Sequence, residues 1–329
     1  MSISYSLIKA ANFAWITASA LVFTATDALA QTFPDRPIRV IVPYGPAGTD
    51  VQMRLAAPFM ARELGQPILV ENKPGGGATL GTTLVRNSPP DGYTLLFSGT
   101  SALSVVPQMK TTQYTMDDFV PIGTLTGTAL IVVSRTDAPF RTLAELIAYA
   151  RANPGKINMG SSGVGTTTHM IGEALQITAG VRFTHVPHTG MGQVVAAMMN
   201  GSADMMIGVP SAFMASVRAG KLLGLATMGT KRSEFMPEAP TAREIGIDVV
   251  EETKFGLVAP RGIPTDVHRK LASALKSAVQ SPEYIEKMRA NFVTALYMTP
   301  EQFGQAMRDE EKYWAAVLAR PELRELKEK

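Results

Sequence analysis

Five short loops rich in glycine and hydroxyl residues can carry chemistry in this chain, because each one directly follows an apolar run. They are residues 44–49, 75–78, 98–101, 160–168 and 188–193. Glycine lets the backbone approach a ligand closely, and a loop that opens a helix presents free backbone N–H groups. Such groups, at the positive end of a helix dipole, favour a small anion. The loops therefore predict an anion site, for which a carboxylate is as suitable as a phosphate.

The motifs of nucleotide sites and of hydrolytic enzymes are absent. The first loop has neither the G-x-G-x-x-G spacing nor the lysine of G-x-x-x-x-G-K-[ST]. The sequence also lacks the G-x-S-x-G nucleophile turn and the H-E-x-x-H metal motif. His185 and His188 are three residues apart, but no cysteine or nearby carboxylate completes a metal site. We expect no metal and no cofactor.

Composition narrows the class of protein further. The 329 residues carry a formal net charge of only +3, and their lysines and arginines are scattered, so nucleic-acid binding is unsupported. The chain has 0 cysteines, which excludes thiol chemistry and a disulfide scaffold. A chain of this length with 46% hydrophobic residues can form one large or two ordinary domains with ample cores.

The first thirty residues have the layout of a secretory signal peptide. Lys9 precedes an apolar stretch, and Ala28-Leu29-Ala30 supplies the small residues of a cleavage site before Gln31. A membrane anchor is the alternative, but the apolar stretch is short and Thr24, Thr26 and Asp27 interrupt its end. The prediction is export to the periplasm, with residues 1–30 removed.

Apolar runs alternate with amphipathic helical patterns through most of the chain. We expect strands at residues 38–43, 68–71, 93–97, 129–134, 156–159, 183–186, 205–207, 222–227 and 255–260, with helices such as 143–152 between them. This alternation predicts an α/β protein with mainly parallel sheets flanked by helices. The strands 129–134 and 255–260 are candidate crossings between domains. They suggest one discontinuous domain, 31–128 plus 255–329, and an inserted domain, 129–254.

The C-terminal part is almost wholly helical. Thr299-Pro300-Glu301-Gln302 reads as a capping box that starts the last helix. Phe303, Met307, Trp314 and Val317 then share one face of that helix, so Trp314 is expected in the core.

Five stretches carry a resemblance to a known family: "FPDRPIRVIVPYGPAGTD", "ENKPGGGATLG", "PPDGYTLLFSGT", "GKINMGSSGVGTTTH" and "GSADMMIGVPSA". They resemble the periplasmic solute-binding receptors of tripartite tricarboxylate transporters, the Bug-type proteins, in order from about Phe33 to Trp314. The resemblance implies a two-domain periplasmic-binding-protein (Venus-flytrap) fold that closes on a small organic acid. It also implies delivery of that acid to membrane permease subunits. Carboxylates in this family are held by backbone N–H groups, hydroxyls and water.

Mapped onto this chain, the resemblance implies a set of ligand-binding residues and no catalytic ones. From the first loop they are Tyr44, Gly45, Pro46, Ala47, Gly48, Thr49 and Asp50, and from the third loop Ser98, Gly99, Thr100 and Ser101. The inserted domain contributes Ser161, Ser162, Gly163, Gly165, Thr166, Thr167, His169, His188 and Gly208. A local hydrogen bond within its helix explains His169 as well as ligand contact does.

Three departures from the family pattern bear on the ligand. The loop "PYGPAGTD" is one residue shorter than usual, and His188-Thr189 replaces a Tyr-Lys pair. Gly208 stands where many members have an acid after the strand, and such an acid would suit a ligand's ammonium group. The expected ligand is therefore a di- or monocarboxylate, aromatic ones included, without a free amine.

Two other functions stay open from the sequence alone. A ligand-sensing receptor subunit that engages a sensor protein would have the same fold and site. An exported α/β hydrolase would need a nucleophile, a base and an acid together. Ser161, His169 and Asp50 have the required chemistry, but no motif places them in one cleft.

Overall fold

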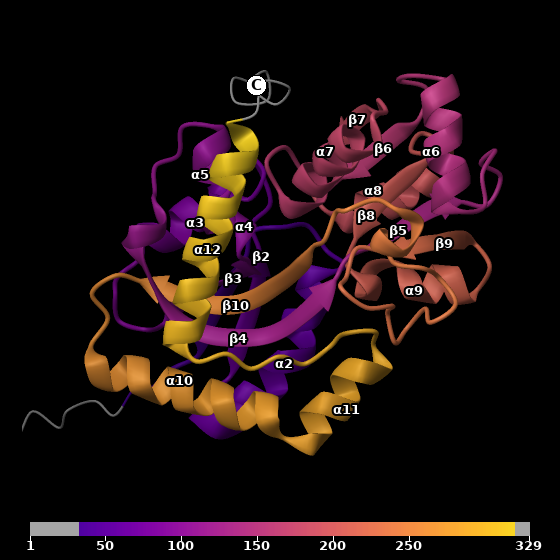
Figure 1. The fold of residues 1–329 in the computed structure, drawn as a ribbon. Coiled ribbons are helices and arrows are strands. Elements are labelled where there is room, and N and C mark those ends of the chain that lie inside the picture. Colours follow the sequence, from indigo (N-terminus) through magenta and orange to yellow (C-terminus); the bar gives the residue numbers. More distant parts are fainter. Residues whose placement is uncertain (1–32, 320–329) are drawn as a thin grey trace, which may run out of the picture. The chain divides into compact units, whose positions relative to one another are not determined.

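Two five-stranded β-sheets form the framework of the chain (Figure 1). A computed structural model describes residues 33–319, and from Arg36 on these belong to one compact unit. The predicted signal peptide lies outside the described residues. Within the described part, no helix is long and apolar enough to span a membrane.

The first sheet has the strand order β2-β1-β3-β10-β4. Its strands are β1 (Ile38–Val42), β2 (Ile68–Asn72), β3 (Thr94–Gly99), β4 (Phe119–Ala129) and β10 (Glu252–Pro260). Its helices are α2 (Thr49–Leu64), α3 (Thr79–Arg86), α4 (Ser101–Ser104), α5 (Val106–Met109), α10 (Thr265–Gln280), α11 (Pro282–Ala290) and α12 (Pro300–Leu318). The last of these, α12, lies across β4, while α10 packs against α2 (Figure 1).

The second sheet has the order β7-β6-β8-β5-β9. Its strands are β5 (Ile131–Arg135), β6 (Asn158–Ser161), β7 (Thr184–Pro187), β8 (Met205–Gly208) and β9 (Leu222–Thr227). Four helices accompany it: α6 (Leu143–Ala152), α7 (Thr167–Ala179), α8 (Met191–Met199) and α9 (Pro210–Arg218). Helix 143–152 and strand 222–227 have the predicted bounds.

The strand pairing is mixed rather than mainly parallel. In the first sheet β1 pairs in parallel with β2 and β3, whereas β10 runs antiparallel to β3 and β4. In the second sheet β6 is parallel to β7 and β8, whereas β5 is antiparallel to β8 and β9. The antiparallel strands β4, β5 and β10 are those that carry the chain between the sheets. The domain boundaries proposed near 128 and 255 stay a prediction.

The sequence pattern does not predict strand β4. Its sequence, FVPIGTLTGTA, contains a proline and two glycines, which weaken the strand pattern. It is nevertheless a full strand, because it pairs with β10 along the whole length of that strand, with two register shifts. The long pairing compensates for the poor local preference.

Trp314 lies in the core, as predicted. Its side chain is 1% exposed and packs in one cluster with Val105, Met109, Met170 and Val317. Met170 belongs to α7 of the second sheet, so this cluster joins helices of both sheets.

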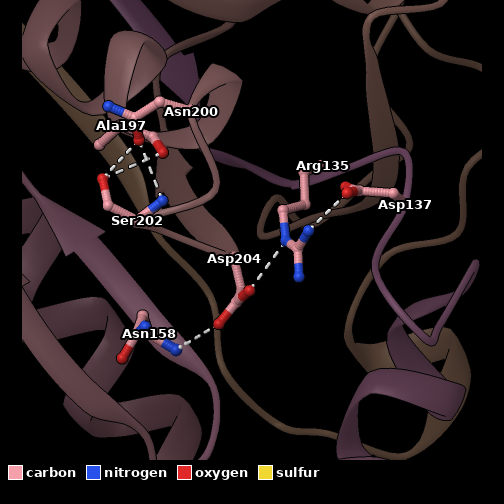
Figure 2. A network of polar contacts seen from close by, with 7 residues as sticks. All are labelled: Arg135, Asp137, Asn158, Ala197, Asn200, Ser202 and Asp204. Carbon is pink, nitrogen blue, oxygen red and sulfur yellow. Dashed lines mark hydrogen bonds and ion pairs between the residues drawn. The ribbon is translucent and has the colours of Figure 1, made fainter.

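A network of polar contacts connects three neighbouring strand ends of the second sheet (Figure 2). Asp204, just before β8, accepts a bond from the backbone N–H of Asn158 at 2.8 Å and from Arg135 Nε at 2.9 Å. Arg135 also contacts Asp137 at 2.7 Å. Ser202 closes the preceding turn by donating to the side chain of Asn200 and the carbonyl of Ala197. Asp204 thus satisfies donors from both strands that flank β8.

Replacing Asp204 with alanine is expected to lower the free energy of unfolding by about 2–3 kcal/mol, because Arg135 and the Asn158 N–H lose a charged acceptor. Asp137→Ala removes a partner of the same arginine, but its side chain is 75% exposed. That control should cost under about 1 kcal/mol. Urea unfolding followed by circular dichroism measures both, and equal losses would contradict the role assigned to Asp204.

Candidate functional site

A small cavity lies where the loops of the two sheets meet. Thirteen residues line it: Tyr44, Ala47, Thr49, Gly99, Leu130, Ser162, Thr166, Thr167, Thr168, Met191, Val209, Thr253 and Phe255. The volume of the cavity is about 20 Å³. This holds about one water molecule, so an organic acid needs the cavity to widen.

The chemistry of the lining is neutral. Seven of the thirteen residues carry hydroxyl groups, namely Tyr44, Thr49, Ser162, Thr166, Thr167, Thr168 and Thr253. Leu130, Met191, Val209 and Phe255 form an apolar part of the wall. Among the described residues that line the cavity, none is a lysine, arginine, histidine, aspartate or glutamate. A charged ligand would therefore be held by hydroxyls and backbone dipoles rather than by a fixed counter-charge.

Four helices begin at the cavity. Thr49 opens α2, Thr166 is the N-cap of α7, Met191 opens α8 and Val209 is the N-cap of α9. In the described structure the side chain of the N-cap residue forms no capping hydrogen bond at any of these four N-termini.

Away from the cavity, three helices have such caps, whereas α3, α5 and α10 lack them as well. Thr142 caps α6, Ser281 caps α11 and Thr299 caps α12. Uncapped first-turn N–H groups at the positive end of a helix dipole are suitable partners for an anion.

Hydrogen bonds join the two sides of the site around the cavity. Ser101, after β3, accepts bonds through Oγ from the Thr167 backbone N–H at 3.2 Å and from Thr167 Oγ1 at 2.7 Å. The Gly45 N–H donates to the Thr189 carbonyl at 3.0 Å. Burial raises the pKa of Tyr44, although a hydrogen bond between its side chain and Ser101 opposes that rise. The phenol therefore stays protonated beside the cavity.

Glycines also meet where the two sides touch. A Cβ on Gly190 would lie 2.9 Å from the Gly45 nitrogen, and one on Gly163 would lie 3.1 Å from Gly77 Cα. A Cβ on Gly77 would overlap the carbonyl oxygen of Val164. These two glycine contacts, Gly45–Gly190 and Gly77–Gly163, let the backbones approach without side chains between them.

The first loop contains a residue in an unusual conformation. Ala47 has φ +81°, a left-handed value that favours glycine. The side chain of Asn72 holds the loop by donating to the Tyr44 carbonyl at 2.9 Å, and Arg54 binds Asn72 in turn. Ala47 therefore places its methyl group in the cavity wall at some cost in backbone energy.

Behind the cavity lies a serine–histidine layer. Ser161 Oγ and His185 Nε2 are 2.6 Å apart, and the rings of His185 and His169 stack with centroids 4.0 Å apart. Burial, followed by repulsion from His169, lowers the pKa of His185 to about 4. His169 Nδ1 accepts from the Gly165 N–H at 3.2 Å, and Glu173 lies 3.5 Å from its Nε2. This layer supports the β6–α7 loop.

The three residues considered for a hydrolase have separate partners. Ser161 is 0% exposed and bonds His185, while His169 contacts Gly165 and Glu173. Asp50 forms an ion pair with Arg54 at 3.0 Å. Within the described residues, no group of three or more His, Cys, Asp or Glu is placed to hold a metal ion.

The structure brings seven of the predicted ligand-binding residues to the cavity wall: Tyr44, Ala47, Thr49, Gly99, Ser162, Thr166 and Thr167. Ten others lie around it in the contacts described above or on the same loops: Gly45, Pro46, Gly48, Asp50, Ser98, Thr100, Ser101, Gly163, Gly165 and His169. Ser161 lies in the layer behind. The Nε2 atom of His188 is buried and has no hydrogen-bond partner among the described residues.

Gly208 does not face the cavity. A Cβ there would lie 2.8 Å from the Phe213 ring, so this side of β8 packs into the core, and the next residue, Val209, lines the cavity instead.

Six lining residues are not among the predicted ligand-binding residues: Leu130, Thr168, Met191, Val209, Thr253 and Phe255, although Thr168 and Met191 lie in the predicted loops 160–168 and 188–193. Met191 and Val209 stand at the starts of α8 and α9, a position that could have marked them.

Two sheets whose loops and helix N-termini converge on one neutral cavity define a periplasmic binding protein with a two-domain fold. The chain belongs to the tripartite tricarboxylate transporter family of receptors, whose family model matches residues 52–323. A UPF0065 protein of Cupriavidus necator is 37% identical over 316 residues, covering 94% of this chain and 95% of its own. Protein BugT of Bordetella pertussis is 32% identical over 309 residues, covering 90% of this chain and 94% of its own.

Solved structures have the same fold. MatC from Rhodopseudomonas palustris with bound malate has a TM-score of 0.83 and 28% identity, and the match covers 87% of this chain and 100% of MatC. A second R. palustris protein, solved with adipate, has a TM-score of 0.83 and 25% identity, with 87% and 97% of the two chains covered.

Proposed function

We propose that the protein is exported to the periplasm, where it captures a small organic acid and delivers it to a membrane permease of the tripartite tricarboxylate type. The observation that carries this is the neutral cavity at four uncapped helix N-termini. Backbone dipoles and hydroxyls there stabilise a carboxylate while leaving it free to dissociate, as delivery requires. The acids bound by MatC and by the adipate complex support the ligand class.

The ligand we propose is a di- or monocarboxylate without an amino group. An ammonium group favours a carboxylate partner, and the described lining has no acidic side chain. Asp50, the single acid in the predicted set, forms an ion pair with Arg54. Leu130, Met191, Val209 and Phe255 suit an apolar body, aromatic or aliphatic, between or beside the carboxylates.

Binding in this proposal requires the two domains to move. We place them at residues 31–128 plus 255–329 and at residues 129–254. A cavity of about 20 Å³ is far smaller than the few hundred Å³ typical of ligand pockets. The acid would enter an open form and favour the closed one through contacts with both domains.

A thermal-shift screen tests this function. At a hundred times its dissociation constant, a ligand adds about 2.7 kcal/mol, which raises the melting temperature by about 5–10 °C. We expect such a shift from at least one of malate, adipate and benzoate. Succinate and glutarate should shift the melt more than aspartate and glutamate. A shift with phosphate or a sugar and none with any carboxylate would refute the proposal.

A sensory role is the second candidate, since the same closed form can engage a signalling protein. Deleting the gene distinguishes the two. Loss of uptake of the acid that binds supports delivery. Unchanged uptake with a lost transcriptional response supports sensing.

A further inference from the structure

A second, larger cavity lies behind the loop that follows β3. Its volume is about 500 Å³. It is lined by Thr100, Val250, Glu251, Glu252, Lys254, Met298, Ala306, Asp309, Glu310, Tyr313 and Trp314. Four of these residues are acidic and one is basic, so this cavity differs sharply from the neutral one.

Glu310 connects the acidic cavity to the ligand side of the molecule. This α12 residue accepts a hydrogen bond from Ser104 Oγ at 2.7 Å, and the Thr100 side chain also bonds to it. Ser101, between these two residues, bonds Thr167 across the neutral cavity. The position of residues 100–104 therefore depends on the state of the Glu310 carboxyl group.

Glu251 lies where the chain returns from the second sheet to the first. Its N–H donates to the Met228 carbonyl at 2.7 Å, and its carbonyl accepts from the N–H of Leu130, the residue between β4 and β5. Both connections between the sheets thus meet at this residue. Its side chain is buried, and Thr253 donates to it at 2.9 Å.

The two carboxyl groups interact. Burial, followed by repulsion from Glu310, raises the pKa of Glu251 to about 8. Burial also raises the pKa of Glu310, against the hydrogen bonds from Thr100 and Ser104. The other charged or titratable groups that face the pair are Glu252 and Lys254 from β10, Asp309 and Tyr313 from α12, and Tyr44 from the first loop. Lys254 favours the charged forms of both carboxyl groups, but its effect on their pKa values is smaller than that of burial.

We propose that Glu251 and Glu310, which line the same cavity, together hold one proton in the closed form, and that this proton keeps Glu310 positioning residues 100–104 for ligand binding. Loss of the proton would place two like charges at the crossing between the sheets and weaken the closed form. The part of this inference that concerns affinity rests on the proposed function.

The direction of the pH dependence follows from linkage. Carboxyl groups that return to ordinary solvation on opening or unfolding also return to pKa values near 4. The closed form then binds more protons than the open or unfolded form between about pH 4 and the raised value. Stability and affinity are therefore highest at the acidic end of this window. They fall as the pH rises through about 8.

Stability measured without any ligand is the first test. The full chain should lose melting temperature between about pH 6 and about pH 9, and Glu251→Gln should flatten this loss, with a melting temperature about 3–6 °C above the parent at about pH 9. Glutamine keeps an acceptor for Thr253. Glu311→Gln, one residue along α12 from Glu310, is the matched control and should follow the parent. Parallel pH profiles for parent and Glu251→Gln would overturn the inference.

Trp314 lines the same cavity and reports on it directly. With Trp15 replaced by phenylalanine, Trp314 is the single tryptophan of the chain. Its fluorescence should titrate with a midpoint near pH 8. Glu251→Gln and Glu310→Gln should each remove that titration. Its persistence in both variants would count against the pair.

Titration calorimetry with adipate and malate tests the link to binding. At about pH 7 and about pH 9 both acids are fully ionised, so a loss of affinity of up to about tenfold at the higher pH reports on the protein. Proton uptake at about pH 7.5, measured in buffers of different ionisation enthalpy, should vanish in Glu251→Gln. If an acid binds tightly with no pH dependence and no proton uptake, the link between protonation of the pair and ligand affinity is overturned. If no acid binds at either pH, the proposed function is refuted. The pH profiles of the melting temperature still test whether the pair of Glu251 and Glu310 holds a proton.

Discussion

Replacing Gly77 with alanine is expected to weaken the binding of organic acids by at least about a hundredfold. A Cβ at this position would overlap the carbonyl oxygen of Val164, which belongs to the loop on the other side of the site. A backbone atom cannot rotate away as a side chain can, so the two loops must separate. The closed form then loses the Gly77–Gly163 contact, and the ligand loses its partners on one side.

Gly180 provides the matched control. It has φ +62°, almost the value of +61° at Gly77, and a Cβ there would meet nothing within 4 Å among the described residues. Gly180→Ala and Gly77→Ala should therefore share a similar backbone penalty of about 1–2 kcal/mol. Only Gly77→Ala should reduce affinity, measured by calorimetry with the acid that shifts the melt most. Equal affinities in the two variants would show that this contact does not control closure.

Replacing Trp314 with alanine is expected to have the largest effect on stability, a loss of about 3–5 kcal/mol. The side chain is 1% exposed and packs against Val105, Met109, Met170, Val317 and Leu318. Because Met170 belongs to α7 and the others to α12, α5 and the residue just before α5, the resulting space would loosen packing between helices of both sheets. Urea unfolding gives the loss directly.

Two variants calibrate that result. Trp314→Phe keeps an aromatic ring in the cluster and should cost clearly less than alanine. Tyr313→Ala alters the neighbouring aromatic, whose side chain is 54% exposed, and should cost under about 1 kcal/mol. A Trp314→Ala variant as stable as Tyr313→Ala would mean that the cluster is not part of the cooperative core.

Local sequence patterns predicted much of the framework, because helices such as Leu143–Ala152 and buried strands such as Leu222–Thr227 follow from short-range periodicity. The same patterns did not predict β4, whose stability comes from pairing with β10, a strand far along the chain. They also did not predict the direction of β4, β5 and β10, since direction depends on how the chain crosses between sheets. Mixed pairing is therefore a property of topology rather than of local preference.

The site was predicted at the level of loops and less well at the level of side chains. Loops at strand ends gather because of the sheet, so Tyr44, Thr49 and Thr166 line the cavity, and their contact with a ligand stays a prediction. Asp50 pairs with Arg54, a partner four residues along the same helix that the sequence does display.

Three further differences have other physical causes. Gly208 ends β8 and packs against Phe213, whereas the next residue, Val209, is the N-cap of α9 and lines the cavity. Thr253 and Phe255 come from β10, and Leu130 comes from the connection between β4 and β5, so no loop pattern marks them.

The two glycine contacts also bear on the entropy of closure. Where long side chains meet, each one that becomes fixed costs about 0.5–1.5 kcal/mol of rotamer entropy. Gly45, Gly190, Gly77 and Gly163 have no rotamers to lose, and their contacts are between backbone atoms. Contact at these points therefore costs little side-chain freedom, and at one of them the Gly45 N–H donates to the Thr189 carbonyl. In the proposed function, a ligand that favours the closed form therefore has little side-chain entropy to offset at these two contacts.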